Sequence, residues 1–381
     1  MDYNDNHSFQ TQNETFTTVP QVKKPKFILA TVLFILTLAS CIFAGFSWAG
    51  TDVVDAFSIQ IAVMYGVLIM VFLLAHELGH FFAARYHKID VTLPYFLPFP
   101  LFSPFGTMGA FIKTKTPIHS KKVLFDIGVS GPLVGFIVCL LFLIIGLLTC
   151  PSIEYLYTIH PDYQYSNWDT TGLYFGDTVL FEILKHIVRA PSYLPPMNEI
   201  YHYPFLCVGW FGLFVTAMNL LPFGQLDGGH ILYAMFGRKQ HTIAKISWWF
   251  LLVLGLGNGF GYLYSLLQID IPGYFFITLQ DYFLPILQWI SENAAWYFMG
   301  WSGWLFWAFL SRFFIKLPHP IVEDENPIGR KRIILGWVSI VLFFLTFTYN
   351  GIYFVDTLVE KTKKTIIQLQ TPNSQQQSLL Q

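Results

Sequence analysis

The chain of 381 residues is 54% hydrophobic, and only 12% of its residues are Asp, Glu, Lys or Arg. A soluble domain carries about 25% charged residues, so this composition predicts a membrane protein. The formal net charge of −1 and the lack of dense Lys and Arg runs exclude a polyanion-binding surface, and no nucleic acid is expected as a partner. The four cysteines have no CxxC spacing, which predicts packing residues and no disulfide framework.

Apolar stretches of spanning length recur along the chain. Residues 1–26 are polar and lack the apolar core of a signal peptide, so we expect a flexible tail there. Segment 27–56 is expected to hold a first transmembrane anchor and a loop, because residues 27–49 can cross about 30 Å of hydrocarbon as a helix. Further stretches fall at 57–84, 123–148, 204–221, 246–267, 296–315 and 333–354. The sequence therefore predicts an all-α polytopic membrane protein with six to eight transmembrane helices.

Residues 94–118 interrupt this helical pattern. The segment is apolar, yet a series of helix breakers divides it: Pro94, Pro98, Pro100, Pro104, Gly106 and Gly109. These breakers predict a small membrane-embedded β-hairpin or a packed re-entrant segment. Non-helical backbone at membrane depth is tolerated only where protein or a water-filled cavity satisfies its N–H and C=O groups, so the segment indicates an internal cavity.

The distribution of Lys and Arg predicts the orientation. Most of the 22 basic residues fall in cytoplasmic connections if the N-terminus is cytoplasmic, as the positive-inside rule requires. The acidic stretch 150–203 then becomes an external loop, within which 172–188 is expected to form an interfacial helix. After a core of 57–267, residues 268–356 are expected to form additional transmembrane helices and 357–381 a polar tail.

The second apolar stretch ends in an HExxH motif that runs from His76 to His80. Two histidines four residues apart share one helix face and can reach one Zn²⁺, while the adjacent Glu77 is placed to take a proton from water. The alternative is a packed polar pair, but an ionisable residue within a membrane span costs a few kcal/mol and needs a partner. We therefore predict His76 and His80 as zinc ligands and Glu77 as the catalytic base.

Hydrolytic zinc normally takes three protein ligands, and Asp227 is the best candidate for the third. It follows Pro222 and Gly224, which would open a helix and let the backbone approach a metal. Asp227 could instead cap a short helix over 228–236, and His230 is a rival third ligand. The other histidines are scattered in loops or at span ends, without the HxxHH clusters of a di-iron enzyme, and are interpreted as solvated or interfacial: His87, His119, His160, His186, His202, His241 and His319.

The HExxH motif and a distant second motif together resemble the site-2 protease family of intramembrane zinc metalloproteases. The second motif, Asn-x-x-Pro-x-x-x-Leu-Asp-Gly, runs from Asn219 to Gly228. The resemblance covers about 57–267, and no PDZ-like insertion is visible, which is typical of the branch without a PDZ domain. Residues 128–135, GVSGPLVG, are similar to a Gly-Pro motif of the family, with Gly135 where many relatives have Asn.

The resemblance also implies roles and partners. It implies one Zn²⁺ per chain held by His76, His80 and Asp227, catalysis by Glu77, and substrate contacts by Asn219 and by a strand over 106–115 that includes Gly106 and Gly109. The expected substrates are single-span membrane proteins or signal-peptide-like segments, cut within or near the lipid bilayer. The expected location is the cell membrane of a bacterium, because no transit peptide is visible.

Two other functions are compatible with these residues. A polytopic metal transporter or binding protein could use the same His and Asp residues, although transport sites usually spread polar groups along several spans. A relative that binds membrane substrates without cutting them would be expected to have lost a motif residue, and both motifs are intact here. The sequence gives no expectation for the oligomeric state.

Overall fold

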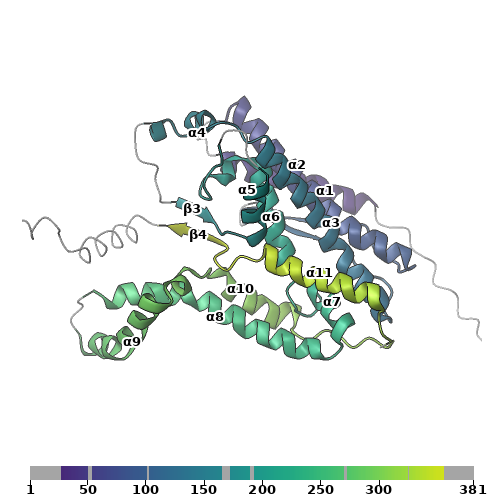
Figure 1. Ribbon diagram of the computed structural model, residues 1–381. Coiled ribbons are helices and arrows are strands. Elements are labelled where there is room, and N and C mark those ends of the chain that lie inside the picture. The colour runs from purple at the N-terminus through teal and green to yellow at the C-terminus, as the bar shows by residue number, and fades with distance from the viewer. Residues whose placement is uncertain are drawn as a thin grey trace, which may run out of the picture.

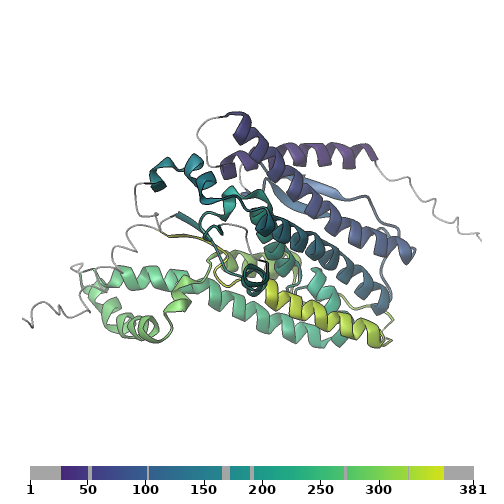
Figure 2. The same ribbon diagram turned by 45° about the horizontal axis from the view of Figure 1, so that its top comes forward.

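The structure is a computed structural model that describes residues 27–49, 54–100, 103–164, 172–188, 193–269, 273–324 and 326–355. The tails expected at 1–26 and 357–381 lie outside these residues, as do parts of the loop 150–203. The described residues form a bundle of helices with two small two-stranded sheets (Figure 1, Figure 2).

Four helices are long and apolar enough to cross a membrane: α1 (Phe27–Ala49), α2 (Ala56–Tyr86), α3 (Lys121–Leu148) and α8 (Lys239–Leu267). A shorter apolar helix, α6 (Pro204–Asn219), and the apolar segment Gly303–Ile315 accompany them. All six lie on stretches that the sequence analysis predicted as spans. The prediction of a mainly α-helical membrane protein is confirmed.

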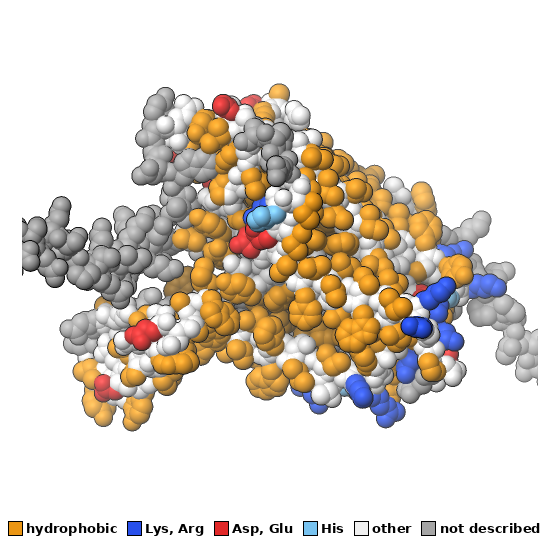
Figure 3. Space-filling view, in the orientation of Figure 1, with side chains coloured by type: hydrophobic (Ala, Val, Ile, Leu, Met, Phe, Trp, Pro, Cys, Tyr) orange, Lys and Arg blue, Asp and Glu red, His pale blue; other side chains and the backbone are white. Residues whose placement is uncertain are grey.

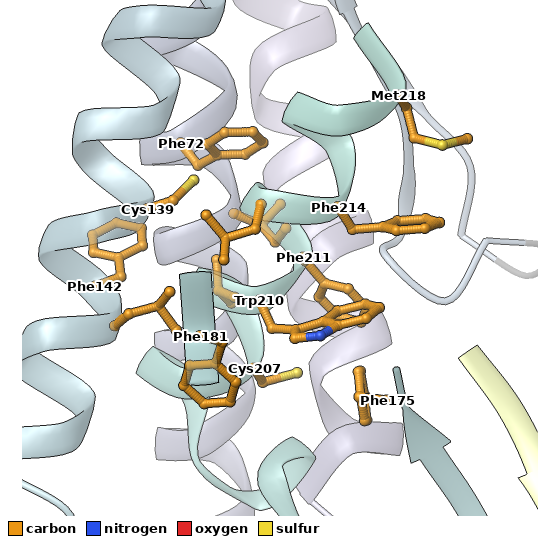
Figure 4. Packing of buried hydrophobic residues seen from close by; sticks show 14 of the residues in the cluster. Phe72, Cys139, Phe142, Phe175, Phe181, Cys207, Trp210, Phe211, Phe214 and Met218 are labelled. Carbon is orange, nitrogen blue, oxygen red and sulfur yellow. The ribbon is translucent and has the colours of Figure 1, made fainter. Parts of the chain in front are cut away.

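Helix α6 forms the centre of the bundle, and nearly all of its side chains are buried. Its aromatic residues pack with side chains of α2 and α3 (Figure 4). Small residues allow this close approach: a Cβ added at Gly212 would lie 2.0 Å from the sulfur of Cys139 on α3. Helices α2 and α3 also meet closely, because a Cβ added at Gly79 would lie 2.6 Å from the carbonyl oxygen of Ser130. Such small-residue contacts are typical of helix packing in membranes.

The predicted hairpin is present between α2 and α3. Strand β1 (Tyr95–Pro98) pairs antiparallel with β2 (Thr107–Phe111), with Tyr95 opposite Phe111. The connection between the strands is fixed to α1, since the Trp48 indole N–H donates to the Pro104 carbonyl at 2.7 Å and the Ser40 hydroxyl donates to the Gly106 carbonyl. The sequence-based expectation of a β-hairpin is therefore confirmed.

The stretch 150–203, expected to be an external loop, contains α4 (Ile153–Ile159), the 3₁₀ turn η1 (Pro161–Gln164), β3 (Gly172–Phe175), α5 (Val179–Ile187) and a second 3₁₀ turn, η2 (Ile200–His202). An interfacial helix over 172–188 was expected, and this is wrong for its first part. Strand β3 pairs antiparallel with β4 (Ile352–Val355) from the far end of the chain. The polar residues Gly176 to Thr178 then separate the strand from α5.

The last two predicted spans are also shorter than expected. Helix α11 (Arg330–Thr346) ends before the turn at Gly351, which has a φ of 48°, and the chain continues as β4, so the prediction of one span over 333–354 is wrong. Such a φ suits glycine and excludes regular helix at this position. The stretch 296–315 is divided into the 3₁₀ turn η3 (Ala295–Met299), α10 (Gly303–Leu310) and the π-helical turn η4 (Ser311–Ile315).

Two further helices complete the fold. Helix α7 (Asp227–Phe236) lies between α3 and α8, where a short helix was expected. Helix α9 (Tyr274–Asn293) lies within 268–356, where further helices were expected, but no span was predicted at its position. It follows α8 and projects from the bundle in both views (Figure 1, Figure 2). It escaped prediction because polar residues interrupt its apolar pattern.

The two ends of the bundle differ in charge. On the visible face, Lys and Arg side chains gather at one end, where α2 finishes and α3, α8 and α11 begin (Figure 3, right). Most of the Asp and Glu side chains visible on this face lie toward the opposite end, near α4 and α9. Between them the surface is mainly hydrophobic. An apolar band between two polar ends is the surface expected of a protein that crosses a bilayer.

Candidate metal centre

Helix α2 supplies three buried polar side chains on the last turns of an otherwise apolar helix. The helix begins with a capping box, in which the Asp55 carboxylate accepts the Ser58 N–H at 2.8 Å. Near its other end, His76, Glu77 and His80 retain only 4%, 6% and 7% of their surface. Burial of this kind requires partners, because an unpaired polar group in an apolar interior is costly.

A tight backbone fold carries Asp227 to the same place. Helix α6 ends at Asn219, and the chain turns through Pro222 and Gly224 before α7 begins at Asp227. Gly228 permits this turn, because a Cβ at that position would lie 2.0 Å from the Leu220 carbonyl oxygen. Leu226 occupies the N-cap position of α7, and the Asp227 carboxylate lies beside the two histidines, so the capping interpretation of Asp227 is not supported.

Three potential ligand atoms converge between α2 and α7. His76 Nε2 lies 3.1 Å from His80 Nε2 and 3.4 Å from Asp227 Oδ2, while His80 Nε2 lies 3.3 Å from Asp227 Oδ1. Two ligands about 2.0–2.1 Å from a tetrahedral zinc are separated by about 3.3 Å. The three side chains therefore have the spacing of ligands around one ion, and they form one of the groups of potential ligands found in the described residues.

The hydrogen bonds of His80 also fit a cation. His80 Nδ1 lies 2.7 Å from the Ile127 carbonyl oxygen, which can only accept, so Nδ1 carries the proton. In the neutral ring, Nε2 then presents a lone pair toward His76 and the Asp227 carboxylate. Backbone carbonyls commonly fix metal-binding histidines in this way. His76 Nδ1 is buried and has no hydrogen-bond partner in the described structure.

Glycines on α3 make room for these ligands. A Cβ at Gly131 would lie 2.1 Å from His80 Nε2 itself, and one at Gly135 would lie 3.2 Å from His76 Nδ1. The GVSGPLVG segment is thus the wall of the site. Gly135, which departs from the pattern of many relatives, lies beside the buried nitrogen of His76.

Glu77 lies next to the cluster but outside the ligand set. Its carboxylate interacts with the backbone of Ile112, one residue beyond β2. The β-hairpin therefore adjoins the residue predicted to be the base.

The other predicted site residues have different surroundings. Asn219 Nδ2 lies 3.5 Å from His76 Nε2, so Asn219 adjoins the cluster. Gly106 is buried against α1, and a Cβ there would lie 2.4 Å from the Ser40 carbonyl oxygen. Gly109, with a φ of 99°, has no neighbouring atom within 4 Å of an added Cβ. Gly106 therefore packs the hairpin onto α1, Gly109 is open to an incoming chain, and a substrate contact by either stays a prediction.

His230, the rival third ligand, has another partner. Its Nδ1 lies 2.8 Å from His319 Nε2, in the segment that precedes α11. The ring of His319 in turn stacks on Tyr233. The described structure thus groups Asp227, and not His230, with the two histidines of α2.

Sequence reasoning missed a second cluster, formed by His160, Glu199 and His202 in the stretch 150–203. Burial lowers the pKa of His202 to about 3, with a further contribution from the neighbouring His160. Burial also raises the pKa of Glu199 to about 7. His160 and Glu199 are 39 positions apart, so no local motif could reveal their proximity.

These are the features of a membrane-embedded metallopeptidase of the HExxH type. An apolar helical bundle surrounds two helical histidines, a distant aspartate and an adjacent buried glutamate. In agreement with this, the sequence profile described as peptidase family M50 matches residues 64–255, half of the chain. The chain belongs to peptidase family M50, and its resemblance to the site-2 proteases is confirmed.

Curated relatives point to the same chemistry. The chain is 28% identical over 297 residues to "Probable zinc metalloprotease EGY1, chloroplastic" of Oryza sativa subsp. japonica, covering 71% of this chain and 47% of that protein. It is 29% identical over 256 residues to the Arabidopsis thaliana protein of the same name, covering 61% and 44%. The chain thus spans about half the length of the curated relatives it matches. Their names agree with the predicted zinc metalloprotease class and zinc cofactor.

Proposed function

We propose that the protein is an intramembrane zinc metalloprotease that hydrolyses peptide bonds of transmembrane substrates within or near the bilayer. The observation that carries the proposal is the convergence of His76, His80 and Asp227 at ligand spacing, with Glu77 buried beside them, inside an apolar bundle. The polar groups of the site are concentrated at one point. This favours a hydrolase over a metal transporter, whose polar groups would be spread along a permeation path.

Each residue has a distinct chemical task. His76, His80 and Asp227 would hold zinc, which as a Lewis acid polarises a carbonyl and makes water a stronger nucleophile. Glu77 accepts the proton of the attacking water and returns it to the leaving amine. The Ile127 carbonyl keeps the His80 ring oriented, and Asn219 offers its amide N–H to the substrate backbone or the developing oxyanion.

The hairpin favours membrane segments that bind in an extended conformation as substrates. Peptide bonds in an α-helix are engaged in i to i−4 hydrogen bonds, so a helical substrate must unwind before it is cut. Strand β2 ends beside Glu77, and an extended substrate paired along the hairpin would lie there by β-augmentation. Single-span membrane proteins and signal-peptide-like segments meet this need.

We also propose an arrangement in the membrane. Six to eight segments cross the bilayer: the four long helices together with the shorter apolar segments, including α6 and α10. The basic end of the bundle in Figure 3 faces the cytoplasm with the N-terminus, and residues 57–267 form the protease core. The proposed location remains the cell membrane of a bacterium; the relatives named above carry a chloroplast designation of their own.

Cleavage of single-span peptides by the full-length protein in detergent tests this function. Glu77→Gln should abolish cleavage while leaving the zinc content unchanged, because the amide cannot take a proton and Glu77 is not a ligand. His80→Ala should remove both activity and one zinc. Glu182→Gln, on α5 in the external loop, is the matched control and should cut normally. Full cleavage by Glu77→Gln would contradict the proposed base, and loss of zinc from it would make Glu77 a ligand.

A further inference from the structure

The external loop contains a second group of metal-binding side chains, far in sequence from the catalytic motifs. His160 follows α4, while Glu199 and His202 flank the 3₁₀ turn η2 just before α6. Ligand atoms of all three residues lie within 4.8 Å of one another. Glu199 and His202 retain 2% and 0% of their surface, so this is an interior cluster and not a set of solvated charges.

The spacing of the atoms matches that of zinc ligands. His160 Nε2 lies 3.0 Å from His202 Nε2, and Glu199 Oε2 lies 3.5 Å from His202 Nε2 and 3.9 Å from His160 Nε2. These three separations bracket the value of about 3.3 Å expected for tetrahedral zinc. The two shorter ones also lie within 0.1 Å of the separations at the catalytic site, which range from 3.1 to 3.4 Å.

The two oxygens of Glu199 have different surroundings. Oε1 accepts hydrogen bonds from the Tyr163 hydroxyl and from Asn198 Nδ2, both at 3.0 Å. Oε2 is buried and accepts no hydrogen bond in the described structure, although it lies between two imidazoles. Outer hydrogen bonds that orient a carboxylate while leaving its other oxygen free are typical of metal ligands.

We propose that His160, Glu199 and His202 form a second zinc site, which is structural and lies on the external side of the bundle. Two imidazoles and one carboxylate are donors that Zn²⁺ accepts, and the fourth position would be taken by water. The proposal is independent of the proposed protease function. It raises the expected stoichiometry from one zinc per chain to two.

The position of the cluster gives the metal a structural task. The ion would join the segment after α4 to the turn that leads into α6, and thereby link the two halves of the external loop. The Tyr155 hydroxyl already bridges these segments, since it donates to the His202 carbonyl at 2.8 Å. Helix α6 runs from this turn to Asn219, which lies beside the catalytic cluster. A zinc ion that fixes the N-terminal end of α6 would therefore also restrict movement of its C-terminal end.

Zinc stoichiometry of the purified full-length protein in detergent, measured by elemental analysis after dialysis against buffered zinc, tests the site. The wild type should hold two zinc ions per chain. Glu199→Gln, which keeps the shape of the side chain and its contacts with Tyr163 and Asn198, should hold one. His186→Asn is the matched control, because this exposed histidine of the same loop lies outside the cluster, and it should hold two. Equal zinc content in the wild type and in Glu199→Gln would overturn the proposal.

A second measurement does not depend on folding of the Glu199 variant. His80→Ala disables the catalytic site, so any tightly held metal that remains reports on the external cluster. Loaded with Co²⁺, this variant should retain one ion per chain with the strong visible absorption of low-coordinate cobalt bound to nitrogen and oxygen. No retained Co²⁺ would overturn the proposal, while retained Co²⁺ together with absent proteolysis in the wild type would leave the second site standing and refute only the proposed function.

Discussion

Gly131 lies in the wall of the metal site, where no larger residue fits. The His80 ring occupies the space that any side chain at 131 would need, with Nε2 only 2.1 Å from an added Cβ. Overpacking of a tight contact costs about 1–3 kcal/mol, and here the displaced atom is a zinc ligand. We predict that Gly131→Ala lowers zinc affinity and proteolytic activity at least about 10-fold, as measured by titration with a competing chelator and by cleavage rate.

The matched control for this change is Gly259→Ala. Gly259 lies on α8 with open space around an added Cβ, and alanine favours helix over glycine by about 1 kcal/mol. It should keep zinc and activity. Equal zinc affinity in Gly131→Ala and the wild type would show that the His80 ring can move away from a side chain at 131 and still bind zinc, against this prediction.

At the scale of elements, a charged cluster joins α2, α3 and α11 at the basic end. Arg332 of α11 makes a bidentate contact with Asp126 of α3, with two nitrogen to oxygen distances of 2.7 Å, and His87 after α2 lies 2.8 Å from the same carboxylate. Bidentate pairs are stronger than single contacts, but these side chains are partly exposed. We predict a coupling energy of about 1 kcal/mol for Asp126→Asn with Arg332→Gln in a double-mutant cycle of unfolding free energies.

The contact of His119 with Glu323 provides the comparison for this cycle. Both side chains are well exposed, so solvent should reduce their coupling to nearly zero. A coupling for Asp126 and Arg332 no larger than that of this exposed pair would mean that α11 is held by apolar packing alone.

Elements defined by local pattern were predictable, and elements defined by distant partners were not. The runs behind α1, α2 and α3 are apolar over spanning lengths, and the breakers in 94–118 identified the hairpin. Residues 352–355, IYFV, look the same as the end of an apolar span, and only their pairing with β3 makes them a strand. The local sequence of β4 gives no indication of its pairing with β3, which lies about 180 positions earlier in the chain.

The site follows the same rule. His76, Glu77 and His80 form a local helical motif, and Asp227 belongs to a second motif with its own breakers, so both were visible in the sequence. The cluster of His160, Glu199 and His202 joins the two ends of a loop, and its histidines were interpreted as solvated or interfacial. That prediction is wrong for His202, which is fully buried, and for His319, which is 5% exposed.

At the scale of the whole molecule, the charge asymmetry in Figure 3 predicts the orientation in the membrane. The four native cysteines are buried, so cysteines introduced at the surface can be labelled over a low background. Lys122→Cys lies at the basic end and Ile187→Cys, at a position 72% exposed, lies in the external loop. A membrane-impermeant maleimide should label Ile187→Cys in sealed cells and Lys122→Cys only in inverted vesicles. The reverse pattern would invert the proposed topology.

The central claim is that a zinc site within the bilayer cuts peptide bonds of membrane segments. The most direct test is to reconstitute zinc-loaded wild type and Glu77→Gln in liposomes with a single-span substrate and to map the products by mass spectrometry. The account predicts cuts inside the apolar segment that depend on both zinc and Glu77. Cuts confined to the aqueous flanks of the substrate, or equal cutting by the two proteins, would contradict it.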